Sequence, residues 1–204
     1  MKSSTASALA FDFFKLLLLA WAYAVSAVFC LQFDVGFSNA SPIWIPSGVA
    51  LYGLSNLGKR GAVAVWLGAF GANFYQFTHD GAANTPYAAA LIGVGNALEA
   101  LYIAVVLEFN GYKFFEAHPS RPKRYLLIII VAPVLGCLIS AVSGATVVTH
   151  IVLADVCKYF EIMRTWLIGD LLGVFSVTYL LQGLEQWLKT ILAARTREQK
   201  KSPS

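Results

Sequence analysis

The stretch YLLIIIVAPVLGCLISAV, residues 125–142, contains no aspartate, glutamate, lysine or arginine. A run of this kind is typical of a helix that crosses a lipid bilayer, because about 20 apolar residues in helical form match the thickness of the hydrocarbon core. The whole chain of 204 residues is 58% hydrophobic and 13% charged, with a mean hydropathy of +0.65. Soluble domains carry roughly 25% charged residues. The composition therefore predicts an integral membrane protein.

Six apolar segments predict an all-α bundle of about six transmembrane helices. They cover approximately residues 13–33, 43–57, 62–77, 87–107, 125–151 and 165–184. Helices are expected because lipid offers no water to unpaired backbone groups, and the chain lacks the ten-residue alternation of a membrane barrel.

Basic residues predict the orientation of this bundle. Thirteen of the fifteen lysines and arginines fall on one predicted side, and only Lys158 and Arg164 fall in the opposite loops. Because positive charge accumulates on the cytoplasmic side, both termini are expected in the cytoplasm. The chain then divides into a cytoplasmic N-terminal segment (residues 1–12), a membrane-embedded bundle (13–184), and a cytoplasmic helical extension with a polar tail (185–204).

The second segment is predicted to be a broken helix. Pro42, Pro46 and Gly48 lie in its outer half, within SPIWIPSG, residues 41–48. Each proline removes a backbone donor, so the chain is expected to enter the membrane as irregular backbone before it becomes helical. Such backbone persists in a membrane when protein buries it or when it lines a polar cavity. The alternative is an interfacial loop anchored by Trp44.

Small residues recur at four-residue spacing in several segments, which is typical of helices that pack closely. The stripes are Ala64, Gly68 and Ala72; Ala89, Gly93 and Ala97; Ala132, Gly136, Ser140 and Gly144; and Gly169 with Gly173. They predict a compact bundle, and any polytopic protein needs such faces. Ile129 is expected to face lipid instead.

Polar residues inside the predicted spans indicate a candidate ligand-binding site. Glu99 lies near the middle of the fourth span and Asp170 lies inside the sixth. A carboxylate at this depth costs about 2.5 to 3.5 kcal/mol on insertion scales, so it normally faces the bundle interior. Asn96 shares the helix face of Glu99, and Asn73 and Ser47 fall in the same outer half. These five residues are expected either to line a pocket open to the outer side or to serve as interhelical hydrogen-bond glue.

The sequence offers no catalytic residues. The motifs GxSxG, HExxH, GxGxxG and the phosphate-binding loop are absent, and no serine or cysteine adjoins an obvious histidine base. The histidines and acidic residues of the outer loops lack a recognised metal-ligand spacing. We therefore expect neither an enzyme nor a metal site, and no cofactor is indicated. The positive charge is explained by orientation in the bilayer, so nucleic acid is not an expected partner.

Several motifs resemble a known family. They are PSGVAL (46–51), GKR (58–60), GAFGANF (68–74), GNALEA (95–100) and WLIGDLLGV (166–174). In this order, from about residue 42 to 182, they resemble the membrane-associated sensor domain of the MASE type. The resemblance implies an integral sensory domain of bacterial inner membranes, which usually precedes a histidine kinase, a diguanylate cyclase or a phosphodiesterase.

The chain departs from the family pattern at three points. The family commonly has about eight spans, Thr178 is followed by Tyr179 where proline is common, and no output domain follows. Leu181, Leu184 and Leu188 begin an apolar seam that ends with Ile191, which is under two heptads and too short for an independent coiled coil.

These features together predict a stand-alone, non-enzymatic sensory or interaction module. It is expected in the bacterial inner membrane as a multi-pass protein, in contact with the lipid bilayer and acting through a separate membrane or cytoplasmic partner protein. A small ligand that reaches the polar residues from the outer side is compatible with this expectation. The alternatives are a small-solute-binding subunit of a membrane transporter and an accessory structural subunit of a larger membrane complex.

Overall fold

The computed structural model describes residues 2–33, 41–82, 84–112 and 120–201. These residues form six α-helices, and no strand occurs among them. The helices are α1 (Lys2–Leu31), α2 (Ile45–Leu57), α3 (Gly61–His79), α4 (Thr85–Phe109), α5 (Pro122–Val147) and α6 (Tyr159–Lys201). The prediction of an all-α fold is confirmed.

Four helical stretches in the described residues are long and apolar enough to cross a membrane. They are Ser7–Leu31, Thr85–Phe109, Pro122–Val152 and Val156–Arg195. The helix α2 has 13 residues, so it is about 20 Å long at 1.5 Å per residue and is shorter than the hydrocarbon core. The structure thus supports a membrane-embedded helical bundle, and six crossings remain a prediction.

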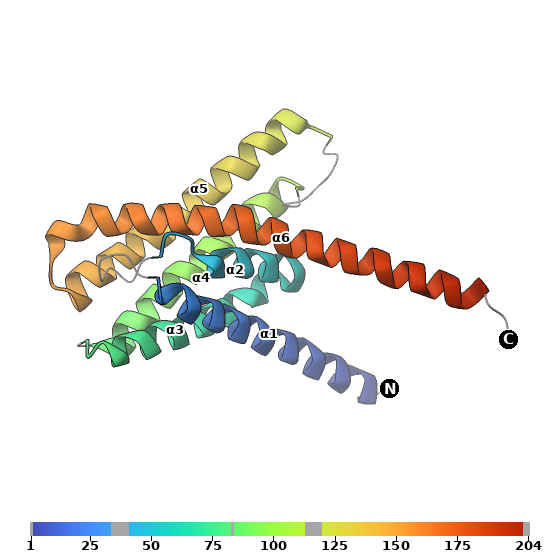
Figure 1. Ribbon diagram of the computed structural model, residues 1–204, viewed down its shortest axis with the longest axis horizontal. Coiled ribbons are helices and arrows are strands. Elements are labelled where there is room, and N and C mark those ends of the chain that lie inside the picture. The colour runs from blue at the N-terminus through green and yellow to red at the C-terminus, as the bar shows by residue number, and fades with distance from the viewer. Residues whose placement is uncertain (1, 34–40, 83, 113–119, 202–204) are drawn as a thin grey trace.

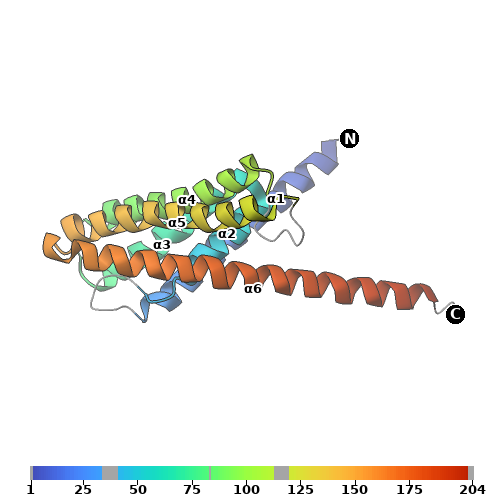
Figure 2. The same cartoon turned by 90° about the horizontal axis from the view of Figure 1, so that it is seen from above.

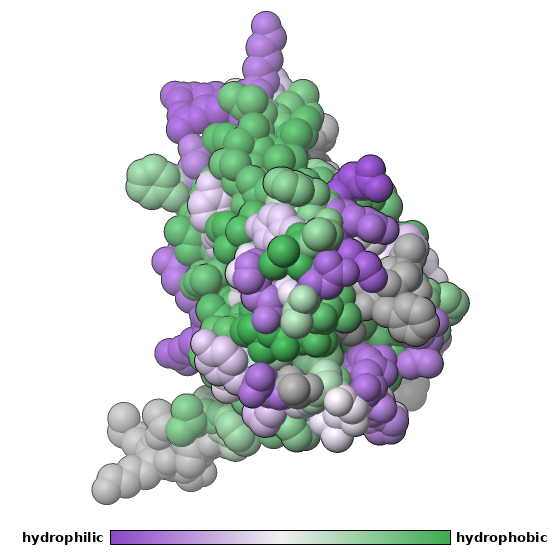
Figure 3. All heavy atoms as spheres, turned by 90° about the vertical axis from the view of Figure 1, so that its left-hand side faces the viewer, coloured by the Kyte–Doolittle hydropathy of each residue, from purple (hydrophilic) through white to green (hydrophobic). Residues whose placement is uncertain are grey.

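The helix ends are sorted between two ends of the bundle. The first residues of α1 and the last residues of α6 lie toward the same end of the bundle. The α2–α3 turn, the C-terminal end of α4 and the N-terminal end of α5 lie there too (Figures 1 and 2). The connections from α3 to α4 and from α5 to α6 lie at the opposite end. Figure 3 views the molecule from that opposite end, where hydrophilic residues are interspersed with hydrophobic ones.

The prediction of a broken second helix needs correction. Residues 41–44 are irregular as expected, but the helix that follows them has no break. The helix α2 runs without interruption from Ile45, and Pro46 lies in its first turn, where a missing N–H removes no helical hydrogen bond. The irregular backbone precedes the helix, and it is buried by protein. Ser41 and Trp44 are 5% and 8% exposed, and the Trp44 N–H donates to the Gly169 carbonyl of α6 at 2.9 Å.

The helix α6 is much longer than the segment predicted from hydropathy. It spans 43 residues, or about 64 Å at 1.5 Å per residue, whereas the apolar run covers 165–184. Its C-terminal part continues beyond the other helices as a single projecting rod (Figure 1). This agrees with the expected helical extension, which begins at residue 185.

The small-residue stripes lie at helix interfaces. A side chain added at Gly68 would meet Ala20 and Tyr23 of α1, and one added at Gly136 would meet Ile103 of α4. The expectation that Ile129 faces lipid is wrong: this side chain is 5% exposed and packs in the core. It is seven residues, nearly two helical turns, before Gly136, so it lies on the same helix face.

Candidate functional site

Six buried polar side chains meet inside the bundle and are here called the central polar cluster. None is more than 3% exposed. The members are Ser47 of α2, Asn96 and Glu99 of α4, Cys137 and Ser140 of α5, and Asp170 of α6.

One half of the cluster joins α2 to α6. The Ser47 hydroxyl donates to Oδ1 of Asp170 at 3.1 Å. The two helices can approach because glycines face each other there: a side chain on Gly48 would meet the Gly173 carbonyl, and one on Gly173 would meet the Trp44 carbonyl. The glycine-rich signatures of both segments therefore place a serine and a carboxyl group in contact.

The other half joins α4 to α5 by two parallel contacts. The Ser140 hydroxyl donates to Oδ1 of Asn96 at 3.2 Å, and the Cys137 thiol donates to Oε1 of Glu99 at 3.6 Å. The partners are three residues apart on each helix, so both pairs lie on facing sides. The Asn96 amide also donates to the Ile92 carbonyl at 3.0 Å, which fixes its orientation.

The two halves form one cluster. Glu99 and Asp170 interact electrostatically, and the hydroxyls of Ser47 and Ser140 lie close enough to interact with both carboxyl groups. Four helices, α2, α4, α5 and α6, thus contribute side chains to one buried region. Of the residues singled out in the sequence, the structure brings together Ser47, Asn96, Glu99 and Asp170. Their use as a ligand-binding site remains a prediction.

Asn73, the remaining member of the predicted site, lies on α3. It is 2% exposed, and its side-chain amide donates to the Ala69 carbonyl of the same helix at 2.9 Å. This bond orients the side chain along its own helix. The predicted place of Asn73 at the mouth of a pocket remains a prediction.

Polar atoms without hydrogen-bond partners gather around the two carboxyl groups. Within the described residues, Oε2 of Glu99 and Oδ2 of Asp170 are buried and have no hydrogen-bond partner. The same holds for the Tyr23 hydroxyl of α1 and for the indole nitrogen of Trp166, which lies four residues before Asp170 on α6. Tyr23 is 1% exposed and interacts electrostatically with both carboxyl groups, with Trp44 beside it. Since unsatisfied buried polar groups are rare in folded proteins, this concentration distinguishes the region from ordinary helix packing.

No ion pair of the described residues includes Glu99 or Asp170. The ion pairs found there join Lys15 to Asp12, Lys59 to Glu108, and Lys189 to Glu185. All three lie toward the end of the bundle that holds the start of α1 and the last turns of α6. In the part of the chain that the structure describes, no basic side chain forms an ion pair with the cluster.

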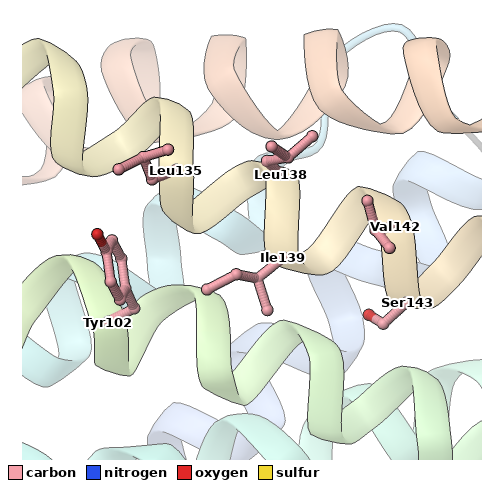
Figure 4. Close-up of a pocket in the computed structure, with 6 residues that line it drawn as sticks. All are labelled: Tyr102, Leu135, Leu138, Ile139, Val142 and Ser143. Atoms are coloured by element: carbon pink, nitrogen blue, oxygen red, sulfur yellow. The ribbon is translucent and has the colours of Figure 1, made fainter.

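A separate apolar groove lies on the surface between α4 and α5. Tyr102 projects from α4 toward Leu135, Leu138, Ile139, Val142 and Ser143 of α5 (Figure 4). None of the cluster residues lines this groove. Its lining suits hydrocarbon, so it is not the predicted polar site.

Comparison with protein families matches the MASE1 family model to residues 15–201. The chain belongs to the MASE1 family. MASE1 domains are membrane-associated sensor domains, so the predicted resemblance is confirmed, and the match extends past both ends of the region recognised from motifs. Comparison with curated proteins and with solved structures gives no match.

The MASE1 motifs recognised in the sequence contain much of the cluster. Ser47, Asn96, Glu99 and Asp170 lie within PSGVAL, GNALEA and WLIGDLLGV. The family is sensory and not catalytic, and the helices suit a membrane. This protein is accordingly a membrane sensor domain with a buried acidic centre.

Three residues at this centre escaped the sequence analysis. Ser140 was predicted to be part of a packing stripe, and Cys137 and Tyr23 were given no role. Only Tyr23 offered a signal, because it lies four residues after Leu19 and four before Ala27 on the buried face of α1. A phenol on the packing face of a transmembrane helix needs a polar partner.

Proposed function

We propose that this MASE1 domain is a non-enzymatic sensory module that crosses the bacterial inner membrane six times and signals through a separate partner protein. One observation carries the proposal. Asp170, a member of the central polar cluster, lies on the same continuous helix that projects from the bundle as far as Lys201. A structural change at the cluster can thus be transmitted along α6 to the part of this helix that projects from the bundle.

Six crossings require the second segment to cross the membrane with irregular backbone before its helix. The helix α2 contributes about 20 Å of the roughly 30 Å hydrocarbon core. The irregular residues 41–44 precede it, with bends at Pro42 and Ile43. The irregular part is admissible at membrane depth because α6 covers it and accepts the Trp44 N–H.

Cytoplasmic placement of both termini agrees with the sorting of helix ends. The end that holds the start of α1 and the last turns of α6 also holds the basic α2–α3 turn. There Lys59 pairs with Glu108 of α4 at 3.5 Å, and both side chains are at least 65% exposed. Exposed charge of both signs fits water better than lipid, and its basic excess fits the cytoplasm.

The projecting part of α6 is the proposed contact surface for the partner. Leu184, Trp187 and Leu188 are 46–59% exposed there, beyond the apolar run. At the point where α6 leaves the bundle, the Tyr52 hydroxyl donates to Oε2 of Glu185 at 2.9 Å. This contact ties the start of the extension to α2. Movement of α6 against α2 would therefore reposition the apolar surface.

The proposal is tested by purification of the tagged protein from its own bacterium in mild detergent, with mass spectrometry of the proteins that accompany it. We expect one defined membrane or cytoplasmic protein to co-purify with the native chain. The L188R variant should lose that protein, because a charge replaces an apolar contact. The Q186R variant, which changes an exposed polar residue of the same extension, should retain it. Equal retention by both variants would contradict the role given to α6.

A further inference from the structure

We infer that Glu99 and Asp170 form a proton-binding site in which the two carboxyl groups share one proton at neutral pH and take up a second on acidification. The role of this site in signalling rests on the proposed function. The ligand is thus a proton from the aqueous phase, which binds to a carboxylate oxygen.

The first argument is the state of the carboxyl oxygens. Each group has one oxygen in a hydrogen bond, to Ser47 or to Cys137, and one that is buried without a hydrogen-bond partner among the described residues. A proton bound to either of these second oxygens would remove the charge from a group that is only partly satisfied by hydrogen bonds. The independent observation is Tyr23, which is 1% exposed, whose hydroxyl also has no hydrogen-bond partner, and which interacts with both carboxyl groups.

The second argument is the charge of the surroundings. Two carboxylates in one buried cluster cannot both stay ionised inside a low-dielectric bundle unless a cation compensates them. The titratable groups that face the pair are Tyr23 of α1, with Cys30 next to it, and Cys137 of α5. The other groups facing it are the hydroxyls of Ser47 of α2 and Ser140 of α5.

None of these neighbouring groups is basic, and the ion pairs of the described residues lie elsewhere. A proton is therefore the simplest compensating cation. One remaining negative charge is acceptable because three donors, the Tyr23 and Ser47 hydroxyls and the Cys137 thiol, surround the pair. This favours a singly protonated pair over a fully neutral one.

The third argument connects the proton to α6. While the pair carries a negative charge, the hydrogen bond from Ser47 to Asp170 is charge-assisted, which makes it roughly twice as strong as a neutral one. Uptake of the second proton removes that charge. The contact between α2 and α6 then weakens at the helix that carries the proposed output surface.

The test is infrared spectroscopy of the purified protein in lipid nanodiscs, titrated with acid in H2O and in D2O. The measured quantity is the C=O stretch of protonated carboxyl groups that are buried. We expect such a band at neutral pH in the native protein, and an increase on acidification in a second, separate step, because the two sites are coupled. The E99Q and D170N variants should each titrate in a single step. E108Q, which changes an exposed carboxyl group, should resemble the native protein.

Two further measurements keep the test decisive. Carbon-13 labelling of aspartate carboxyl groups in the native chain should shift part of the band, so the assignment does not depend on variants that fold poorly. Replacement of potassium by sodium should leave the band unchanged, whereas its loss would assign the site to a metal cation. Absence of the band at neutral pH, or a single step in the native protein, would also overturn the proton site. Either result leaves the partner experiment with L188R unaffected, so the two proposals can fail separately.

Discussion

Replacement of Gly173 by alanine tests the close approach of α6 to the chain that precedes α2. A methyl group at this position would meet the carbonyl oxygen and carbon of Trp44, which are backbone atoms and cannot rotate away. Overpacking of this kind costs about 1–3 kcal/mol. The intrinsic helix preference of alanine over glycine returns about 0.5–1 kcal/mol. We therefore expect G173A to lose unfolding free energy, by up to about 2.5 kcal/mol.

Gly183 supplies the matched control on the same helix. Nothing lies within 4 Å of a methyl group built there, so G183A should gain about 0.5–1 kcal/mol from helix preference alone. Reversible unfolding in mild detergent, followed by circular dichroism, measures both changes against the native chain. The two variants should differ in sign. If G173A were as stable as G183A, the tight contact between α6 and Trp44 would be wrong.

Labelling and packing variants give two further expectations. The exposed thiol of Cys157 should react with a membrane-impermeant maleimide added outside cells. A cysteine at Lys59 in a C157S background should react only after permeabilisation. The opposite pattern would overturn the orientation. G136L should reduce the yield of folded protein because the side chain would collide with Ile103. G71L should have little effect, because this position is exposed and nothing lies within 4 Å of an added methyl group. Equal yields would show that the stripe is no interface.

Hydropathy and charge predicted the helices that lie within the apolar runs, because lipid imposes length and composition on them. The bounds of α3 and α4 differ from the predicted 62–77 and 87–107 by one or two residues. Hydropathy predicted only residues 165–184 of α6, because charged residues lower the hydropathy on either side. Its continuation after residue 184 was expected from the apolar seam that begins at Leu181. The break expected in α2 was misplaced because Pro46 occupies a first turn, where proline is tolerated.

The two carboxyl groups of the cluster were predicted from the energetic cost of placing them in a membrane. The residues that surround them were not predicted to belong to the same site. Glu99 and Asp170 could be selected from the sequence because a carboxyl group at membrane depth is energetically costly and normally faces the bundle interior. Cys137 carries no such signal, and the signal of Tyr23 is weaker. The place of both residues depends on how each helix is rotated about its axis. Ile129 shows the same difficulty, because an isoleucine suits lipid and core equally.

The central claim is that the buried acidic pair controls the position of α6. Spin labels on cysteines at Lys59 and Gln186, in a C157S background, report the distance between the α2–α3 turn and the extension by pulsed electron resonance. The native protein in nanodiscs should give different distance distributions at neutral and acidic pH. D170N, which has no carboxylate at the Ser47 contact between α2 and α6, should show the acidic distribution at both. Identical distributions in all four samples would contradict the account.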